Sequence, residues 1–180
     1  QFTILGDKNQ VINPYLKYNT LEEVGNIFSS AKYYRLSKTY RSSNEIISFA
    51  NKILHLNDVE CVRVPTNTPV IKRFSEDIKS IDDDLMNLIN SYKRIAVITK
   101  TYEETEELYS KLDKTHIRKV DENISKPVTI TPAYLAKGLE FDAVIVYTNI
   151  KGKFMESEAN LYYVAVTRAQ HKLIVYNQNM

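Results

Sequence analysis

The sequence predicts an α/β fold with a mostly parallel sheet and helices on both faces. Apolar, β-branched runs typical of buried strands alternate with segments whose apolar residues recur at helical spacing. Strands separated by single helices favour a parallel sheet that is covered on both sides. The hydrophobic share is 43% over 180 residues. That share is enough for a packed core, and the length suits one domain, or one domain with a short piece of another.

Two helices in the first half are predicted from their start signals. Thr20 is followed by Glu23, and Ser42 by Glu45. This spacing is typical of capping boxes, in which a hydroxyl and a carboxylate satisfy backbone N–H groups at a helix start. A strand is expected before them, over residues 2–5, where an apolar run stops at a Gly-Asp pair.

The second half continues the alternation of strands and helices. Further strands are expected at 70–74, 94–99, 128–131, 143–147 and 173–176. One helix is expected at 78–89 and another at 160–169. A third is expected to begin at Thr101, where Thr101 and Glu104 have the spacing of a capping box. The charged, weakly periodic stretch 113–126 is predicted to be a surface linker.

In parallel sheets, ligands bind beyond the carboxyl ends of the strands. Gly6 and Asp7 follow the first predicted strand, and Lys100 and Thr101 follow the strand 94–99. The sequence therefore predicts a site at that edge of the sheet.

Composition excludes some classes of protein and leaves others open. The net charge of +2 neither favours nor excludes nucleic acid as a partner. No stretch approaches the roughly 20 apolar residues that span a bilayer, so no membrane association is expected. The single cysteine, Cys61, cannot form an internal disulfide, which favours a reducing, cytoplasmic setting. The first predicted strand has no initiator methionine before it, so we expect a fragment of a longer protein.

Read without any relative, the chain lacks a complete active site. No Gly-x-x-x-x-Gly-Lys-Ser/Thr phosphate loop occurs in the sequence. The three histidines show no metal-ligand spacing, and the acidic run at 82–84 is predicted to be the solvated face of a helix. No metal site is predicted. The chemistry would have to be completed by another part of the protein.

Four short segments, taken in order, resemble the motifs of superfamily 1 helicases of the UvrD/Rep type. Residues 6–10 (GDKNQ) resemble motif III, 40–43 (YRSS) motif IV, 137–142 (KGLEFD) motif V and 163–169 (YVAVTRA) motif VI. The resemblance implies a RecA-like domain of the P-loop NTPase type that lacks its own phosphate loop. Residues 1–33 would be the trailing end of a first RecA-like domain, carrying motif III. Residues 34–180 would be the second, carrying motifs IV, V and VI.

The resemblance implies that the chain is the C-terminal motor domain of an ATP-dependent DNA helicase or translocase. Its partners would be the N-terminal RecA-like domain of the same protein and single-stranded DNA. The nucleotide would be ATP with Mg²⁺, whose metal ligands are expected in that N-terminal domain. The fragment alone is therefore expected to be inactive.

Three residues have catalytic roles by resemblance. Gln10 would sense the γ-phosphate and the attacking water, Arg41 would reach the γ-phosphate, and Arg168 would be the arginine finger. Cations placed on the transferring phosphoryl group provide most of what a protein adds to this reaction. Arginine suits the task because its planar fork donates two hydrogen bonds and stays charged.

Three further residues would bind the nucleotide. Tyr40 would stack on the adenine, Glu140 would accept a hydrogen bond from the ribose, and Gly138 would allow a close backbone approach. Without the resemblance to the helicase motifs, each of these residues could instead have an ordinary structural role. The arginines could form surface ion pairs, Tyr40 could simply pack, Gly138 could serve a turn and Glu140 could be solvated. Asp7 is predicted to shape its turn rather than to touch nucleotide.

The nucleic-acid contacts depart from the family pattern. Tyr15 is the aromatic left to stack on a base after motif III, and Tyr134 stands where a backbone-contacting Thr-x-His usually opens motif V. The departures, together with the shortness of the segment 113–126, resemble the HelD (helicase IV-like) branch. That resemblance implies an alternative function, an ATP-driven remodeller that acts on RNA polymerase.

Overall fold

Six strands form one fully parallel sheet in the computed structural model, which describes residues 3–12, 27–28, 30–122 and 125–178. Every neighbouring pair in the sheet is parallel, which confirms the predicted fold class. Across the sheet the order is β3 (Ile71–Arg73), β8 (Ala169–Tyr176), β7 (Phe141–Tyr147), β4 (Ile95–Thr99), β6 (Val128–Pro132) and β5 (Ile117–Lys119).

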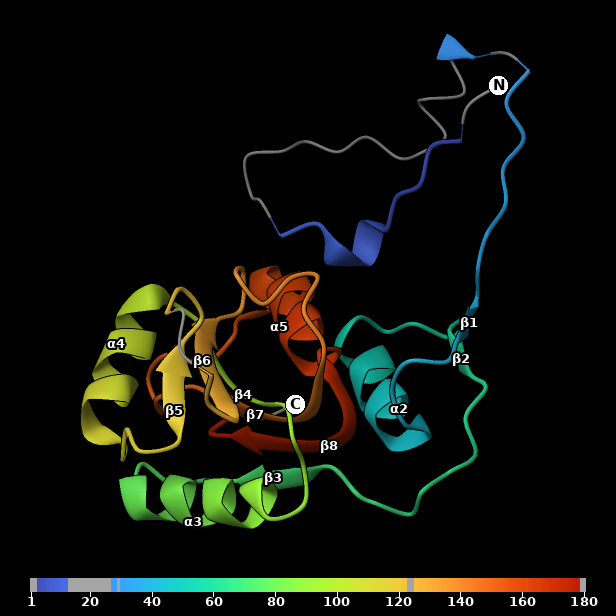
Figure 1. Ribbon diagram of the computed structural model, residues 1–180. Coiled ribbons are helices and arrows are strands. Elements are labelled where there is room, and N and C mark those ends of the chain that lie inside the picture. Colours follow the sequence, from blue (N-terminus) through green and yellow to red (C-terminus); the bar gives the residue numbers. More distant parts are fainter. Residues whose placement is uncertain (1–2, 13–26, 29, 123–124, 179–180) are drawn as a thin grey trace.

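Helices cover both faces of this sheet (Figure 1). On one face, α2 (Asn44–Ile53) and α5 (Ala159–Val166) pack in the same core cluster as Ala96 and Ile98 of β4. On the other face, α3 (Ile78–Ile89) and α4 (Tyr102–Lys111) pack with Ile95 and Val97. Successive side chains of a strand point to opposite faces, so the central strand contributes to both cores.

The N-cap predicted for α4, Thr101, is present, whereas the N-cap of α2 lies one residue later than predicted. The Thr101 hydroxyl accepts the Glu104 N–H at 3.2 Å. At α2 the cap is Ser43, whose hydroxyl accepts the Ile46 N–H at 3.5 Å. The predicted cap, Ser42, is wrong because its hydroxyl instead donates to the distant Ala169 carbonyl at 2.6 Å.

Several predicted boundaries are corrected by the structure. The predicted linker 113–126 contains β5, which pairs with β6 at the sheet edge. The helix predicted over 160–169 ends at Val166, and β8 begins at Ala169. Residues 3–5 form no strand, although one was predicted over 2–5. The helix predicted from Thr20 lies outside the described residues. A short pair, β1 (Lys38–Thr39) with β2 (Glu60–Cys61), was not predicted.

Asp84 departs from the predicted solvated acidic face. Its side chain is only 8% exposed and accepts both arms of the Arg73 guanidinium, at 2.7 and 2.8 Å. The Tyr176 hydroxyl donates to the same carboxylate at 2.7 Å. The carboxylate lies on the buried side of α3, and these two partners compensate its burial.

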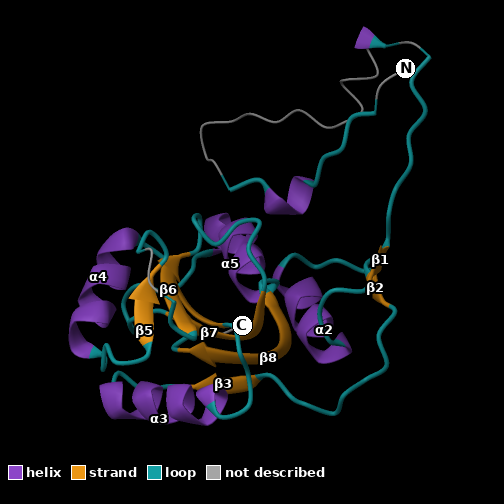
Figure 2. Cartoon of the chain, viewed as in Figure 1, coloured by secondary structure: helices purple, strands orange, loops and turns teal. Residues whose placement is uncertain are grey.

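Figure 2 shows the described residues 3–12 as loop with one helical turn. That turn, η1 (Lys8–Gln10), contacts α5. The side-chain amide of Asn160 donates to the Val11 carbonyl at 3.0 Å. Residues 8–11, within the segment predicted to belong to a first domain, therefore lie against α5.

Candidate functional site

The structure brings four predicted site residues together at the amino ends of β7 and β8. Glu140 directly precedes β7, and Arg168 directly precedes β8. Arg41 lies in the loop before α2, and Gln10 in η1. The strand rule had instead predicted a site at the carboxyl end of the sheet, from Gly6, Asp7, Lys100 and Thr101. The four residues that lie together follow helices or loops and not strands, so the rule does not apply to them.

The loop that carries Arg41 is bound to the start of β8. The Ser43 N–H donates to the Gln170 carbonyl at 2.9 Å, next to the bond from Ser42 to the Ala169 carbonyl. These bonds place residue 41 beside residue 168, although 127 positions separate them along the chain. The local sequence alone carries no sign of this contact.

Arg41 and Glu140 form an ion pair at the surface. The Arg41 Nε lies 2.8 Å from the Glu140 Oε1, and the two side chains are 42% and 37% exposed. The other carboxylate oxygen accepts from the Gln170 side-chain amide at 2.8 Å. Ion pairs of this exposure stabilise a fold only weakly. The Arg41 side chain is thus held by an ion pair that is weak enough to be exchanged for another partner.

Arg168 is enclosed, with 1% of its surface exposed. Its Nε donates to the Val164 carbonyl at 3.0 Å, and its Nη1 to the Leu139 carbonyl at 3.2 Å. Its Nη2 makes longer contacts, with the Thr167 hydroxyl at 3.4 Å and the Gln10 side-chain oxygen at 3.5 Å. The guanidinium is therefore held on two sides and weakly engaged on the third.

The electrostatic setting of Arg168 favours an added negative charge. Burial and the nearby Arg41 guanidinium lower the pKa of Arg168, while Glu140 acts in the opposite direction. Among the described residues, Arg168 forms no ion pair. A buried cation that forms no ion pair is costly, so an anion bound beside it would be stabilised. Two adjacent guanidinium groups are a donor set suited to phosphate oxygens.

Gln10 is oriented by its own turn. The Asp7 carboxylate accepts the Asn9 N–H at 2.9 Å and the Gln10 side-chain amide at 2.6 Å. Asp7 thus shapes the turn, the role expected for it from the sequence. The amide oxygen of Gln10 is left to face Arg168.

The remaining predicted residues lie around this cluster or outside the described chain. Tyr40 is 69% exposed and adjoins Arg41. Gly138 has φ +87°, a left-handed conformation that favours glycine, with open space where a side chain would be. Tyr134 is 46% exposed in the loop between β6 and β7. Tyr15 lies outside the described residues.

At the carboxyl end of β4, where the strand rule predicted a site, the polar residues bind one another and the neighbouring backbone. Lys100 pairs with Glu158 at 2.6 Å and donates to the Lys153 carbonyl. Glu104 is buried, which raises its pKa, and it accepts the backbone N–H groups of Lys100 and Asn149. These residues hold the loop after β7 against the start of α4.

Two residues at the cluster were missed from the sequence. Gln170 holds Glu140, and Arg63 donates to the Arg41 carbonyl at 2.8 Å. Gln170 was signalled weakly, as a polar residue beside motif VI at the start of an apolar strand. No pattern in the sequence points to Arg63.

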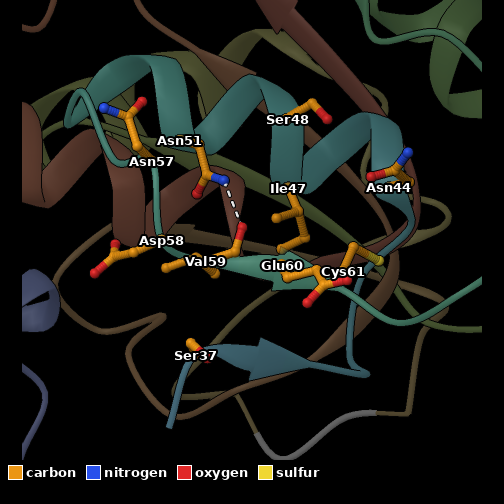
Figure 3. Close-up of a pocket in the computed structure, with 10 residues that line it drawn as sticks. All are labelled: Ser37, Asn44, Ile47, Ser48, Asn51, Asn57, Asp58, Val59, Glu60 and Cys61. Carbon is orange, nitrogen blue, oxygen red and sulfur yellow. Dashed lines mark hydrogen bonds between the residues drawn. The ribbon is translucent and has the colours of Figure 1, made fainter. Parts of the chain in front are cut away.

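A separate cleft of about 470 Å³ lies between α2 and β2 (Figure 3). Amides and carboxylates line it, including Asn44, Asn51, Asn57, Asp58 and Glu60. It shares no residue with the arginine cluster, and no lysine or arginine lines it. Its chemistry is therefore unsuited to phosphate.

The described ranges hold neither a cluster of metal ligands nor a membrane-spanning helix. These residues contain no group of three or more His, Cys, Asp or Glu side chains that could hold a metal ion. The helices they form include none that is long and apolar enough to cross a bilayer.

Comparison with known proteins adds evidence to this geometry. Residues 127–176 match the model of the UvrD-like helicase C-terminal domain. The predicted resemblance to that domain is confirmed. The match spans β6 to β8 and includes Gly138, Glu140 and Arg168, whereas Gln10 and Arg41 lie outside it.

A solved structure supports the same relationship. The chain is similar to the C-terminal domain of a possible DNA helicase from Lactobacillus plantarum WCFS1, with 28% identity and a TM-score of 0.61. The similarity covers 77% of this chain and 86% of that one. No protein of curated function matches the sequence. The chain is therefore similar in sequence and fold to UvrD-like helicase C-terminal domains, and the finer resemblance to the HelD branch stays a prediction.

Proposed function

We propose that this chain is the C-terminal motor domain of an ATP-dependent DNA helicase or translocase. In this role it supplies Arg168 as an arginine finger, with Arg41, to a nucleotide held by a partner RecA-like domain. The observation that carries the proposal is a buried guanidinium bonded only to neutral oxygens, beside a second guanidinium. The match to the UvrD-like helicase domain supports it.

The proposed chemistry is electrostatic. Phosphoryl transfer spreads negative charge over the phosphoryl oxygens, and fixed cations stabilise that charge. Arg168 is pre-oriented by two backbone carbonyls, so little reorganisation accompanies the reaction. Arg41 has a surface ion pair that it can exchange for a phosphate oxygen. Gln10 would orient the attacking water next to them.

The other proposed contacts with the nucleotide follow from where Tyr40, Glu140 and Gly138 lie. Tyr40 would offer its exposed ring to the adenine, beside Arg41. Glu140 would accept from the ribose, and Gly138 would keep the neighbouring backbone open. Mg²⁺ ligands are assigned to the partner domain. Placing the arginines on one domain and the phosphate loop on another would couple hydrolysis to domain closure.

The test is the substitution Arg168→Ala in the intact protein. Loss of an arginine finger lowers kcat by about 10³- to 10⁵-fold. We expect a fall of this size with little change in nucleotide affinity, measured by steady-state ATPase kinetics and by nucleotide binding.

Because Arg168 is buried, Arg168→Lys is made in parallel, and the melting temperature of each variant is recorded. Lysine keeps the charge but loses the fork, so kcat should remain low while the fold is retained. Turnover at the wild-type rate in folded Arg168→Ala protein would refute the proposal.

A further inference from the structure

Arg63 contacts the candidate site from a part of the chain to which no role has been assigned. It lies in the loop after β2, 22 residues beyond Arg41. Its Nη1 donates to the Arg41 carbonyl at 2.8 Å and to the Gln170 carbonyl at 3.3 Å. Its Nη2 lies 3.2 Å from the His171 Nδ1. One guanidinium therefore ties three residues on two separate segments.

The backbone that carries Arg63 is itself anchored on both sides. Before it, the Val62 N–H donates to the Thr39 carbonyl at 2.9 Å. After it, the Glu45 carboxylate of α2 accepts the N–H groups of Thr66 and Asn67, at 2.9 and 2.7 Å. The guanidinium is thus aimed at the start of β8 by bonds on either side of it.

These contacts close a ring around the predicted catalytic arginine. Arg63 holds the backbone of Arg41 and of Gln170. The Gln170 side chain donates to one oxygen of Glu140, and the Arg41 Nε lies against the other. Each member is therefore fixed by two others. In such a ring, loss of one bond loosens the side chain that the remaining bonds orient.

We infer that Arg63 is a positioning residue, which with Gln170 holds the Arg41 guanidinium beside Arg168. It touches neither nucleotide nor reacting atoms and acts through the backbone of Arg41. The inference rests on the proposed function, because it assigns Arg63 to the same reaction. A misplacement of about 1 Å in a catalytic group can cost about 100-fold in rate.

The experiment compares Arg63→Met, Arg63→Lys and Arg41→Ala with the double variant Arg63→Met/Arg41→Ala in the intact protein. We expect Arg63→Met to lower kcat about 10- to 100-fold, with the KM for ATP nearly unchanged. Arg63→Lys should recover part of the loss, since an ammonium can still donate to the Arg41 carbonyl. The double variant should be no slower than Arg41→Ala alone, because both substitutions disable one group.

A second readout does not depend on activity. Hydrogen exchange of a peptide covering residues 40–44, followed by mass spectrometry, should be faster in Arg63→Met, since the Ser43 N–H is bonded to a carbonyl that Arg63 holds. Arg118→Met is the matched control. Arg118 is also partly buried and donates to two backbone carbonyls, those of Lys119 and Glu122, but at the β5 edge of the sheet. It should leave kcat and this peptide unchanged.

The outcomes separate this inference from the proposed function. Unchanged kcat in Arg63→Met, or losses that multiply in the double variant, would overturn the positioning role. If Arg63→Met does not fold, kcat and the hydrogen exchange of the peptide 40–44 are measured on Arg63→Lys instead. Wild-type values of both in that variant would overturn the positioning role. Wild-type turnover in Arg41→Ala would instead count against the proposed function.

Discussion

Asp84 and Arg73 show how a single ion pair joins a helix to the sheet edge. Burial by itself would raise the pKa of Asp84, but hydrogen bonds from Arg73 and Tyr176 outweigh it and hold that pKa below its ordinary value. The same contacts raise the pKa of Arg73. The pair connects α3 to β3, and Tyr176 connects it to β8.

Asp84→Asn should therefore destabilise the protein in a pH-dependent way. Hydrogen bonds to a charged group are worth about 1.5–3 kcal/mol, and Arg73 is partly exposed, so we expect a loss of about 2 kcal/mol at pH 7. The folded pKa of Asp84 is lowered, so its contribution is complete above the unfolded value of about 4. It is lost as pH falls further through the folded value.

Urea denaturation at pH 7 and at several pH values below 4 measures the free energy of unfolding of both proteins. The difference in that free energy between wild type and Asp84→Asn should narrow as the pH falls. Asp83→Asn, at an exposed position on the same helix, is the control and should change little. An undiminished gap at low pH would contradict the assignment.

At the scale of elements, the start of α2 carries two serines with different roles. Ser43 caps the helix, and Ser42 ties the same loop to β8. Both bonds lie beside Arg41, so the element boundary and the candidate site depend on the same few residues.

Ser43→Ala should lower the free energy of unfolding by about 1 kcal/mol, the usual cost of losing an N-cap hydroxyl. Ser48→Ala, at an exposed interior position of α2, should be neutral or slightly stabilising, since alanine is the better helix former. Thermal or urea unfolding of the two variants compares them directly. Equal effects at both positions would show that Ser43 is not the cap.

For the molecule as a whole, the proposed function predicts single-stranded DNA as the partner of the intact protein. If single-stranded DNA is that partner, it should stimulate the ATPase of the intact protein, and the stimulation should weaken steeply with salt. Binding to single strands falls with salt concentration with a slope of about −0.7 for each phosphate contacted. Titration of the intact protein with oligothymidylate at several salt concentrations measures the stimulation of its ATPase and how that stimulation depends on salt.

Tyr134→Ala should weaken that stimulation, since stacking on a base is worth about 1–3 kcal/mol. Tyr102→Ala is the control, at 48% exposure against 46% for Tyr134, on α4. Stimulation by RNA polymerase and not by DNA would contradict the DNA assignment and favour the remodeller.

Much of the fold followed from local patterns. Apolar runs predicted five of the six strands of the sheet. Helical spacing and capping signals predicted α2, α3 and α4, and a helix was also expected where α5 lies, because these signals reside in neighbouring residues. β5 was missed, since three residues in a charged stretch carry too short a pattern. Asp84 was misread because its partners, Arg73 and Tyr176, lie on other elements.

The sequence by itself determined five strands of the main sheet and the helices that cover it, the residue types suited to a nucleotide and the resemblance to UvrD-type helicases. Only the tertiary structure decided that Arg41, Glu140 and Arg168 meet at the amino ends of β7 and β8, and that Arg63 and Gln170 hold them there. The physical reason is that these contacts join segments far apart in the chain. Hydrogen bonds and burial between such segments leave no periodic trace in the sequence.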